Sequence, residues 1–142
     1  MSNDLDDFEQ FMKRRESAAR AYVNGDATPL GSIVTRVSPA TFFAPKGGSR
    51  QGADEVSSAY KHDAEIFETG SDSSFEILQM AASDGIAYWV GFQRATARMR
   101  GQTEAIPFNL RITEVFRRED DEWKLVHRHA DPLASEAEEN KK

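Results

Sequence analysis

The second half of the chain contains two strand–turn–strand segments, and this pattern constrains the fold more than any other feature of the sequence. The first pair of strands flanks Ser83-Asp84-Gly85, a turn sequence typical of β-hairpins. The second pair flanks the acidic segment Glu119-Asp120-Asp121-Glu122. The expected strands are residues 75–82, 86–99, 107–118 and 123–129. Together they predict a largely antiparallel sheet.

The first half of the chain is mainly helical in pattern. Apolar residues recur at three- and four-residue steps up to the stop sequence Asn24-Gly25-Asp26, which predicts a helix over the first 25 residues. Similar spacing predicts a short helix over 29–35 and a longer one over 53–67. Between them, residues 41–44 predict a short strand that ends at Pro45-Lys46-Gly47-Gly48.

Helices followed by antiparallel strands are typical of the α+β class, in which the helices pack on one face of the sheet. Long hairpins that bend would close that face into a cone-shaped barrel. The chain has 142 residues, the size of one domain. We expect a single domain over residues 1–131 and a disordered acidic tail over 132–142.

Composition excludes several kinds of partner and site. The net charge is −6, which argues against nonspecific binding to nucleic acid. The sequence has no cysteine, and no apolar run approaches the roughly 20 residues that cross a bilayer. Its first ten residues are acidic and polar, unlike a secretory signal. We therefore expect a cytoplasmic protein without disulfides, thiolate metal sites or membrane contacts.

The last hairpin places ionisable groups on an apolar face. With Asp120-Asp121 as a two-residue turn, Glu114 faces His127 and Ile112 faces His129, because side chains alternate along a strand. A buried carboxylate costs several kcal/mol unless it is paired, so Glu114 needs a partner or a wet cavity. Glu114, His127 and His129 are therefore the candidate catalytic residues, as a pair that moves protons or orients a ligand.

Two alternatives stay open at this hairpin. A one-residue bulge in the acidic loop would replace the two histidines on the inner face by Val126 and Arg128, and Arg128 would then pair with Glu114. The pair can also be purely structural and fix the register of the hairpin. In either register, Glu114 has a cationic partner nearby.

Aromatic residues at helix or strand spacing are candidates for the wall of an apolar pocket, although the same spacing is typical of ordinary core. The candidate ligand-binding residues are Tyr22, Phe43, Tyr60, Trp89, Phe116 and Arg128. Residues 86–99 are apolar on both faces, which predicts that a second subunit covers the outer face, as in a homodimer. We expect no metal site, since the alternating spacing of His127, His129 and Asp131 is only weak evidence for metal ligands. The arginines are expected at solvated or interface positions: Arg14, Arg15, Arg94, Arg98 and Arg100.

Residues 111–131, Arg-Ile-Thr-Glu-Val-Phe-Arg-Arg-Glu-Asp-Asp-Glu-Trp-Lys-Leu-Val-His-Arg-His-Ala-Asp, resemble the nuclear transport factor 2-like superfamily. Within it, the SnoaL-like, ketosteroid-isomerase-related group is the most similar. The resemblance covers Phe8 to Asp131 and implies a cystatin-like cone closed by N-terminal helices. The association domains of calcium/calmodulin-dependent kinases end in a similar segment; these domains assemble into rings and catalyse no reaction.

The resemblance also bears on catalysis. The steroid isomerases of this superfamily use a tyrosine and two aspartates, and the matching positions here are Ala18, Ala44 and Glu114. Because only Glu114 is acidic, Δ5-steroid isomerisation by that mechanism is not expected. The kinase association domains have arginines at the positions of Glu114 and Ala130, so a pocket in this chain is expected to have a different charge preference. The Glu114 carboxylate at its floor would favour neutral hydrogen-bond donors or cations as ligands.

Two functions follow from these observations. The first is a cofactor-free pocket for a small hydrophobic molecule, with proton-transfer chemistry of the isomerase, cyclase or dehydratase type left open. The alternative is a noncatalytic dimerisation or ligand-binding module.

Overall fold

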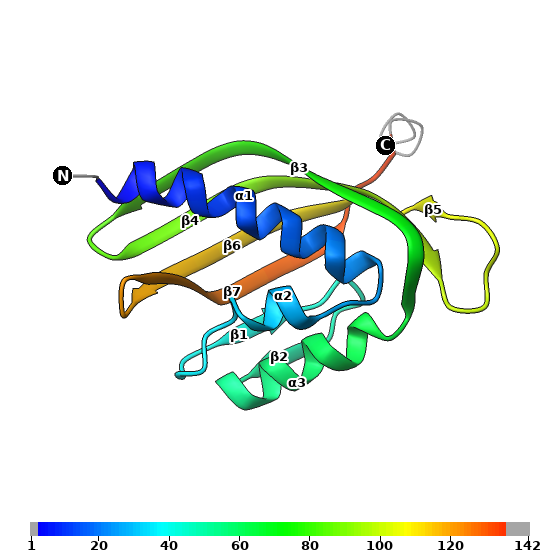
Figure 1. Ribbon diagram of the computed structural model, residues 1–142, viewed down its shortest axis with the longest axis horizontal. Helices are drawn as coiled ribbons and strands as arrows, with labels where there is room; N and C mark the ends of the chain where they lie inside the picture. The colour runs from blue at the N-terminus through cyan, green and yellow to red at the C-terminus, as the bar shows by residue number, and fades with distance from the viewer. Residues whose placement is uncertain (1–2, 136–142) are drawn as a thin grey trace.

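The computed structural model describes residues 3–135 as helices packed on one side of a curled sheet (Figure 1). The helices are α1 (Asp4–Val23), α2 (Thr28–Gly31) and α3 (Ala53–Ala64). The strands are β1 (Thr41–Phe43), β2 (Ser49–Gln51), β3 (Phe67–Ser83), β4 (Ile86–Met99), β5 (Ile106–Pro107), β6 (Leu110–Glu119) and β7 (Glu122–Pro132). Of the expected tail, residues 136–142 lie outside the described residues.

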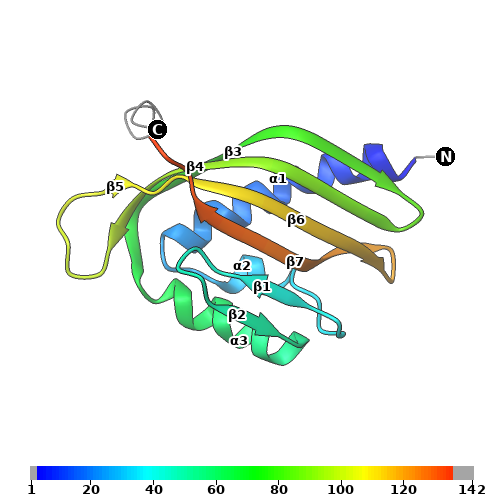
Figure 2. The ribbon, with the colours of Figure 1, turned by 180° about the vertical axis from the view of Figure 1, so that it is seen from behind.

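The sheet is mostly antiparallel and open. Its strand order is β2-β1-β7-β6-β4-β3, with β5 paired to β4. Among the strands of residues 3–135, only the pair β1 and β7 is parallel. The helices cover the inner face, whereas the outer face carries no helix when the described residues are seen from behind (Figure 2). The expected α+β cone with a cystatin-like layout is therefore confirmed, as a strongly curled sheet that does not close into a full barrel.

Local chemistry explains the limits of α1. The Asn3 side chain accepts a hydrogen bond from the Asp6 amide at 2.7 Å, and acids fill the first turn, where the helix dipole is positive. The helix ends before Gly25, whose φ is +92° and whose added Cβ would lie 2.7 Å from the Phe67 carbonyl oxygen. Only glycine fits that position without strain. None of the described helices is long and apolar enough to cross a membrane.

Both predicted hairpins form, and both turns use residues with positive φ. Asp84 and Gly85 connect β3 to β4, with φ of 55° and 80°. Asp120 and Asp121 connect β6 to β7, with φ of 50° and 66°. Left-handed conformations at both central positions match the twist of a two-residue hairpin.

The structure differs from the sequence-based expectation mainly at β3 and the helices before it. The helix expected over 53–67 ends at Ala64, and the short helix expected over 29–35 spans only Thr28–Gly31. β3 begins at Phe67, eight residues before the expected strand, because its pairing with β4 continues past an irregularity between Glu68 and Asp72. Strand β2 was not predicted from the sequence, since Ser49–Gln51 is polar and exposed.

Candidate functional site

Glu114 lies at the centre of the inner face of β6, with none of its surface exposed. Arg15 of α1 binds it through two parallel hydrogen bonds, from Nε to Oε1 at 3.0 Å and from Nη2 to Oε2 at 2.7 Å. Arg128 of β7 donates from Nη1 to Oε2 at 2.7 Å, and Trp89 of β4 donates from Nε1 to Oε1 at 2.8 Å. This buried polar cluster joins one helix to three neighbouring strands.

The cluster continues along β7, β4 and β3. Arg128 Nη2 donates to Gln93 Oε1 at 2.8 Å, and Gln93 Nε2 donates to Ser73 Oγ at 3.0 Å. Gln93 and Ser73 are also buried. The first bond orients Arg128 toward Glu114, and the second orients the Gln93 amide that accepts from Arg128.

The register of the last hairpin corrects one sequence-based expectation. Phe116 faces Leu125 as expected, but Glu114 faces Arg128 and Ile112 faces Ala130, so the pairing of Glu114 with His127 was wrong. A bulge at Val126, within β7 and not in the acidic loop, shifts the later part of the strand by one residue. The alternative pairing of Glu114 with Arg128 is therefore confirmed, whereas Val126 itself has no partner on β6. Arg128 inside the sheet pairs with the buried carboxylate and so avoids the cost of an unpaired charge.

The electrostatics of the cluster hold Glu114 in its ionised form. Burial alone raises the pKa of this carboxyl, but the charges and hydrogen bonds of Arg15 and Arg128 outweigh it and lower the pKa to about 2. At neutral pH, Glu114 is a carboxylate that accepts four donors. It has little tendency to take up a proton.

The buried charges do not balance. Among the described residues, the buried charged side chains are Arg15, Arg128 and Glu114, which leaves one positive charge in the interior. Three buried side-chain donors have no hydrogen-bond partner in the described part of the chain: Arg15 Nη1, the Tyr60 hydroxyl and Trp123 Nε1. Trp123 packs instead against Phe8 and Arg118. The phenol is neutral at physiological pH, as tyrosines ordinarily are, and burial raises the pKa of Tyr60 further. Arg15 Nη1 and the Tyr60 hydroxyl are therefore two donors available to a ligand, next to one excess positive charge.

Tyr60 of α3 is buried in the same interior as the polar cluster. The charges of Arg128, Glu114 and Arg15 all act on the pKa of its phenol. Its ring packs on Phe42 with the ring centroids 4.5 Å apart. Tyr22 is half-buried, packs against Phe67, and has a pKa that is raised by burial and by the charge of Asp63.

The remaining predicted site residues divide between the two faces of the sheet. Trp89 and Phe116 are fully buried, and Phe116 packs against Phe8 and Phe11 of α1. Phe43, His127 and His129 lie together on the outer face, where both imidazoles meet the Phe43 ring edge-on. The structure therefore separates both histidines from Glu114.

His127 is held on that outer face by a short contact, 2.7 Å from its Nδ1 to Thr41 Oγ1. Burial and the neighbouring His129 lower its pKa. His129 is half-exposed, with its Nε2 3.7 Å from an oxygen of Asp131. No three His, Asp or Glu side chains in residues 3–135 are placed to hold a metal ion together.

Sequence reasoning missed Arg15. It was expected at a solvated or interface position, but only 2% of its surface is exposed. Its place on the apolar face of α1, at helical spacing from Phe8 and Met12, was the available indication. An arginine at such a position needs a buried acid, and Glu114 supplies it.

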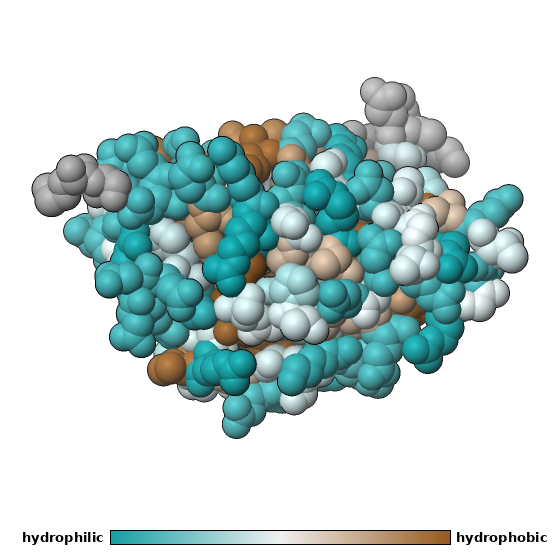
Figure 3. Space-filling view, viewed as in Figure 1, coloured by the Kyte–Doolittle hydropathy of each residue, from teal (hydrophilic) through white to brown (hydrophobic). Residues whose placement is uncertain are grey.

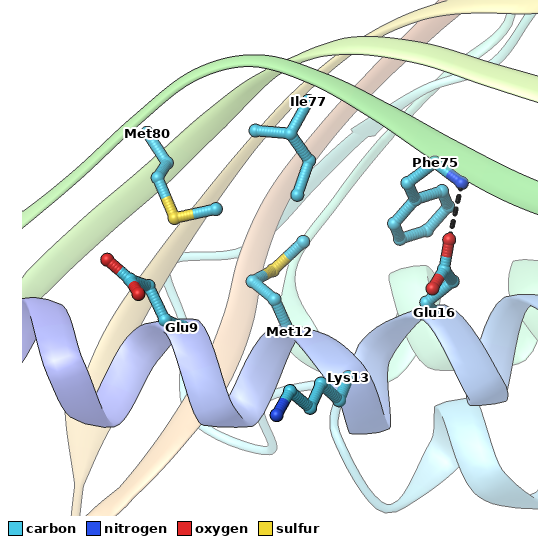
Figure 4. Close-up of a pocket in the computed structure, with 7 residues that line it drawn as sticks. All are labelled: Glu9, Met12, Lys13, Glu16, Phe75, Ile77 and Met80. Atoms are coloured by element: carbon cyan, nitrogen blue, oxygen red, sulfur yellow. Dashed lines mark hydrogen bonds between the residues drawn. The ribbon is translucent and has the colours of Figure 1, made fainter.

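Two hollows on the described surface lie outside this cluster. One, of about 160 Å³, lies between α1 and β3 and is lined mainly by apolar side chains (Figure 4). The other, of about 300 Å³, lies between the turn after β1 and the end of β7, beside Phe43, His129 and Asp131. Neither hollow includes Glu114 in its lining.

Comparisons with known proteins agree with this fold. Residues 13–135 match the SnoaL-like domain family. A search of curated proteins finds no match.

Solved structures of the nuclear transport factor 2-like superfamily resemble the chain over most of its length. A candidate dehydratase from Streptomyces avermitilis has a TM-score of 0.72 at 21% identity, covering 92% of this chain and 98% of its own. A superfamily protein from Salmonella enterica has a TM-score of 0.74 at 14% identity, covering 92% of each chain. A candidate calcium/calmodulin-dependent protein kinase type II association domain from Thiobacillus denitrificans has a TM-score of 0.66 at 16% identity. The match covers 85% of this chain and 93% of that domain.

Proposed function

This chain belongs to the SnoaL-like domain family, and we propose that it binds a small organic anion inside its cone, at Arg15, Arg128 and Tyr60. The observation that carries the proposal is the excess positive charge of the buried cluster, together with the two unpartnered donors beside it. An isolated charge in a protein interior is costly, and a bound carboxylate would neutralise it. The same carboxylate would accept hydrogen bonds from Arg15 Nη1 and Tyr60 Oη.

This proposal reverses the ligand preference expected from the sequence. A lone carboxylate at the floor of the pocket would favour cations or neutral donors. Two guanidinium groups around that carboxylate favour an anion instead.

Binding explains the geometry better than proton transfer does. A dehydratase, such as the Streptomyces relative is thought to be, needs a group that exchanges protons near neutral pH. The pKa of Glu114 is about 2, and the pKa of Tyr60 is raised well above its ordinary value. His127 and His129 lie on the other face of the sheet, so we assign no proton transfer to the Glu114–histidine pair.

Calorimetric titration with butanoate, butanamide and 1-butanol tests the proposal. We expect butanoate to bind with a Kd of about 1 mM or tighter and the two neutral analogues to bind far more weakly, because only the anion compensates the buried charge. Equal binding of the three compounds, or none, would overturn the proposal.

The Tyr60→Phe variant shows whether binding occurs at the proposed site. It removes only the unpartnered hydroxyl, so we expect the fold to remain, the free energy of unfolding to rise by about 1 kcal/mol, and butanoate to bind about tenfold more weakly. Tyr88→Phe is the matched control. The Tyr88 hydroxyl donates to Gln79 at 3.0 Å on the outer face, so its loss should leave butanoate binding unchanged.

A second role, as a homodimerisation module, rests on the outer face of the sheet. Half-buried apolar residues of β4 line up there with those of β6, and the register pairs Tyr88 with Val115 and Val90 with Thr113. The ion pairs Arg94–Glu76 and Arg111–Asp131 lie on the strands around them. An apolar centre with a charged rim is typical of a protein interface, so we propose that two copies pack through this face.

A further inference from the structure

The hollow between α1 and β3 lies directly behind one wall of the buried cluster. Phe75 of β3 lines the hollow and stacks on Trp89, with the ring centroids 4.5 Å apart. The Arg15 guanidinium lies over the same Phe75 ring, 5.3 Å from its centroid. One aromatic side chain therefore separates the hollow from Arg15 and Trp89, two of the three residues that donate to Glu114.

The hollow has an apolar floor. Met12 extends from α1 toward the strand, while Phe75, Ile77 and Met80 extend from β3 toward the helix (Figure 4). Ile77 is 38% exposed, and the space-filling view shows hydrophobic atoms over the crest of β3 (Figure 3). Apolar side chains on both sides of an open hollow form a binding surface for a hydrocarbon chain.

The charges around the hollow determine the orientation of such a ligand. Glu9, Lys13 and Glu16 are all in its lining, but Glu9 and Glu16 point toward β3, whereas Lys13 points away from the strand (Figure 4). Glu16 accepts a hydrogen bond from the Phe75 amide at 2.7 Å. These carboxylates repel an acid group at the mouth of the hollow. Arg15, on the far side of Phe75, attracts it.

We infer that the ligand is an amphipathic carboxylate, whose acid group lies at Arg15 and Tyr60 and whose hydrocarbon chain lies between α1 and β3. The inference rests on the proposed function, since it assigns the acid group to the same buried cluster. A ligand that spans both places displaces the Phe75 ring, and its chain replaces that ring against Trp89. Phe75 is half-buried on β3, which is an edge strand, and the inference requires its ring to turn toward that open edge of the sheet.

Calorimetric titration with butanoate and octanoate tests the chain-binding part separately from the anion-binding part. Each buried methylene strengthens binding about fourfold, so we expect octanoate to bind at least about tenfold more tightly than butanoate. Ile77→Glu places a charge in the hollow and should abolish this advantage while leaving butanoate binding unchanged. Leu78→Glu is the matched control: Leu78 is 57% exposed and does not line the hollow, so the advantage should remain.

The possible outcomes distinguish the two proposals. If octanoate binds no more tightly than butanoate, the chain-binding inference fails and anion binding stands. If the advantage of octanoate survives Ile77→Glu, the chain lies elsewhere and the inference also fails. If neither acid binds, both proposals fail.

Discussion

Arg15 on α1 and Glu114 on β6 are 99 residues apart in the sequence and form a two-bond ion pair in the interior, with contacts of 3.0 Å and 2.7 Å. This pair fixes the first helix to the middle of the sheet. Arg128 shares the same carboxylate from the neighbouring strand. The stability of the cone and its proposed ligand preference therefore depend on one cluster.

Glu114→Gln should strongly destabilise the protein. The substitution leaves Arg15 and Arg128 buried without a countercharge, and breaking a buried pair in this way costs about 3–5 kcal/mol. The free energy of unfolding from urea titration measures the loss. Glu76→Gln is the control, because Glu76 pairs with Arg94 at half-exposed positions and should change stability by less than about 1 kcal/mol. Equal losses in the two variants would contradict the role assigned to Glu114.

The contribution of Glu114 to stability should disappear in acid. Its pKa is about 2 in the folded protein, against an ordinary value of 4.5, so the stabilisation is complete above about pH 4.5 and is lost as the pH falls toward 2. The shift corresponds to about 3 kcal/mol. We expect the difference in unfolding free energy between the parent and Glu114→Gln to shrink by about this amount between pH 6 and pH 2.5. A difference that does not change with pH would show that Glu114 is not ionised in the folded state.

Gly91→Ala should disrupt the pairing of β3 with β4. A Cβ at this position would lie 2.0 Å from the backbone carbonyl oxygen of Glu76, and backbone cannot move aside cheaply. We expect a loss of more than about 2 kcal/mol in unfolding free energy. Gly31→Ala in α2 is the control, since an added Cβ there meets nothing within 4 Å. Similar stabilities of the two variants would show that β3 is not held against β4 as described.

Val90→Lys should convert the proposed dimer into a monomer. Val90 lies at the centre of the outer face, and a lysine at the same position on both copies would place like charges in the interface. Light scattering after size exclusion should give twice the chain mass of 15.9 kDa for the parent and that mass for the variant. Thr103→Lys adds the same charge at an exposed position in the segment between β4 and β5 and should remain a dimer. A monomeric parent protein would overturn the dimer proposal.

Much of the fold follows from patterns that are local in the sequence. The Asp84-Gly85 and Asp120-Asp121 turns fix the hairpins, and alternation along residues 110–116 places Glu114 on the inner face. The helical spacing of Phe8, Met12 and Ala18 sets the buried face of α1. Such patterns can be recognised without knowledge of the rest of the chain.

The composition of the cluster could not be obtained in the same way. The bulge at Val126 decides whether His127 or Arg128 faces Glu114, and strand alternation alone allows either. The choice depends on Arg15, which reaches Glu114 only after α1 packs on the sheet. β3 was also predicted too short, because the polar stretch Thr69-Gly70-Ser71-Asp72 resembles a loop until β4 is beside it.

Diffraction from crystals soaked in 3-bromopropionate tests the central claim most directly, because anomalous scattering locates the bromine independently of the protein atoms. We expect the carboxylate within hydrogen-bonding distance of Arg15 Nη1 and Tyr60 Oη, with the bromine a few bonds away inside the cone. The same soak with Tyr60→Phe crystals should give a much weaker bromine peak. Bromine found only on the outer surface, with Arg15 Nη1 and Tyr60 Oη still unpartnered, would contradict the account.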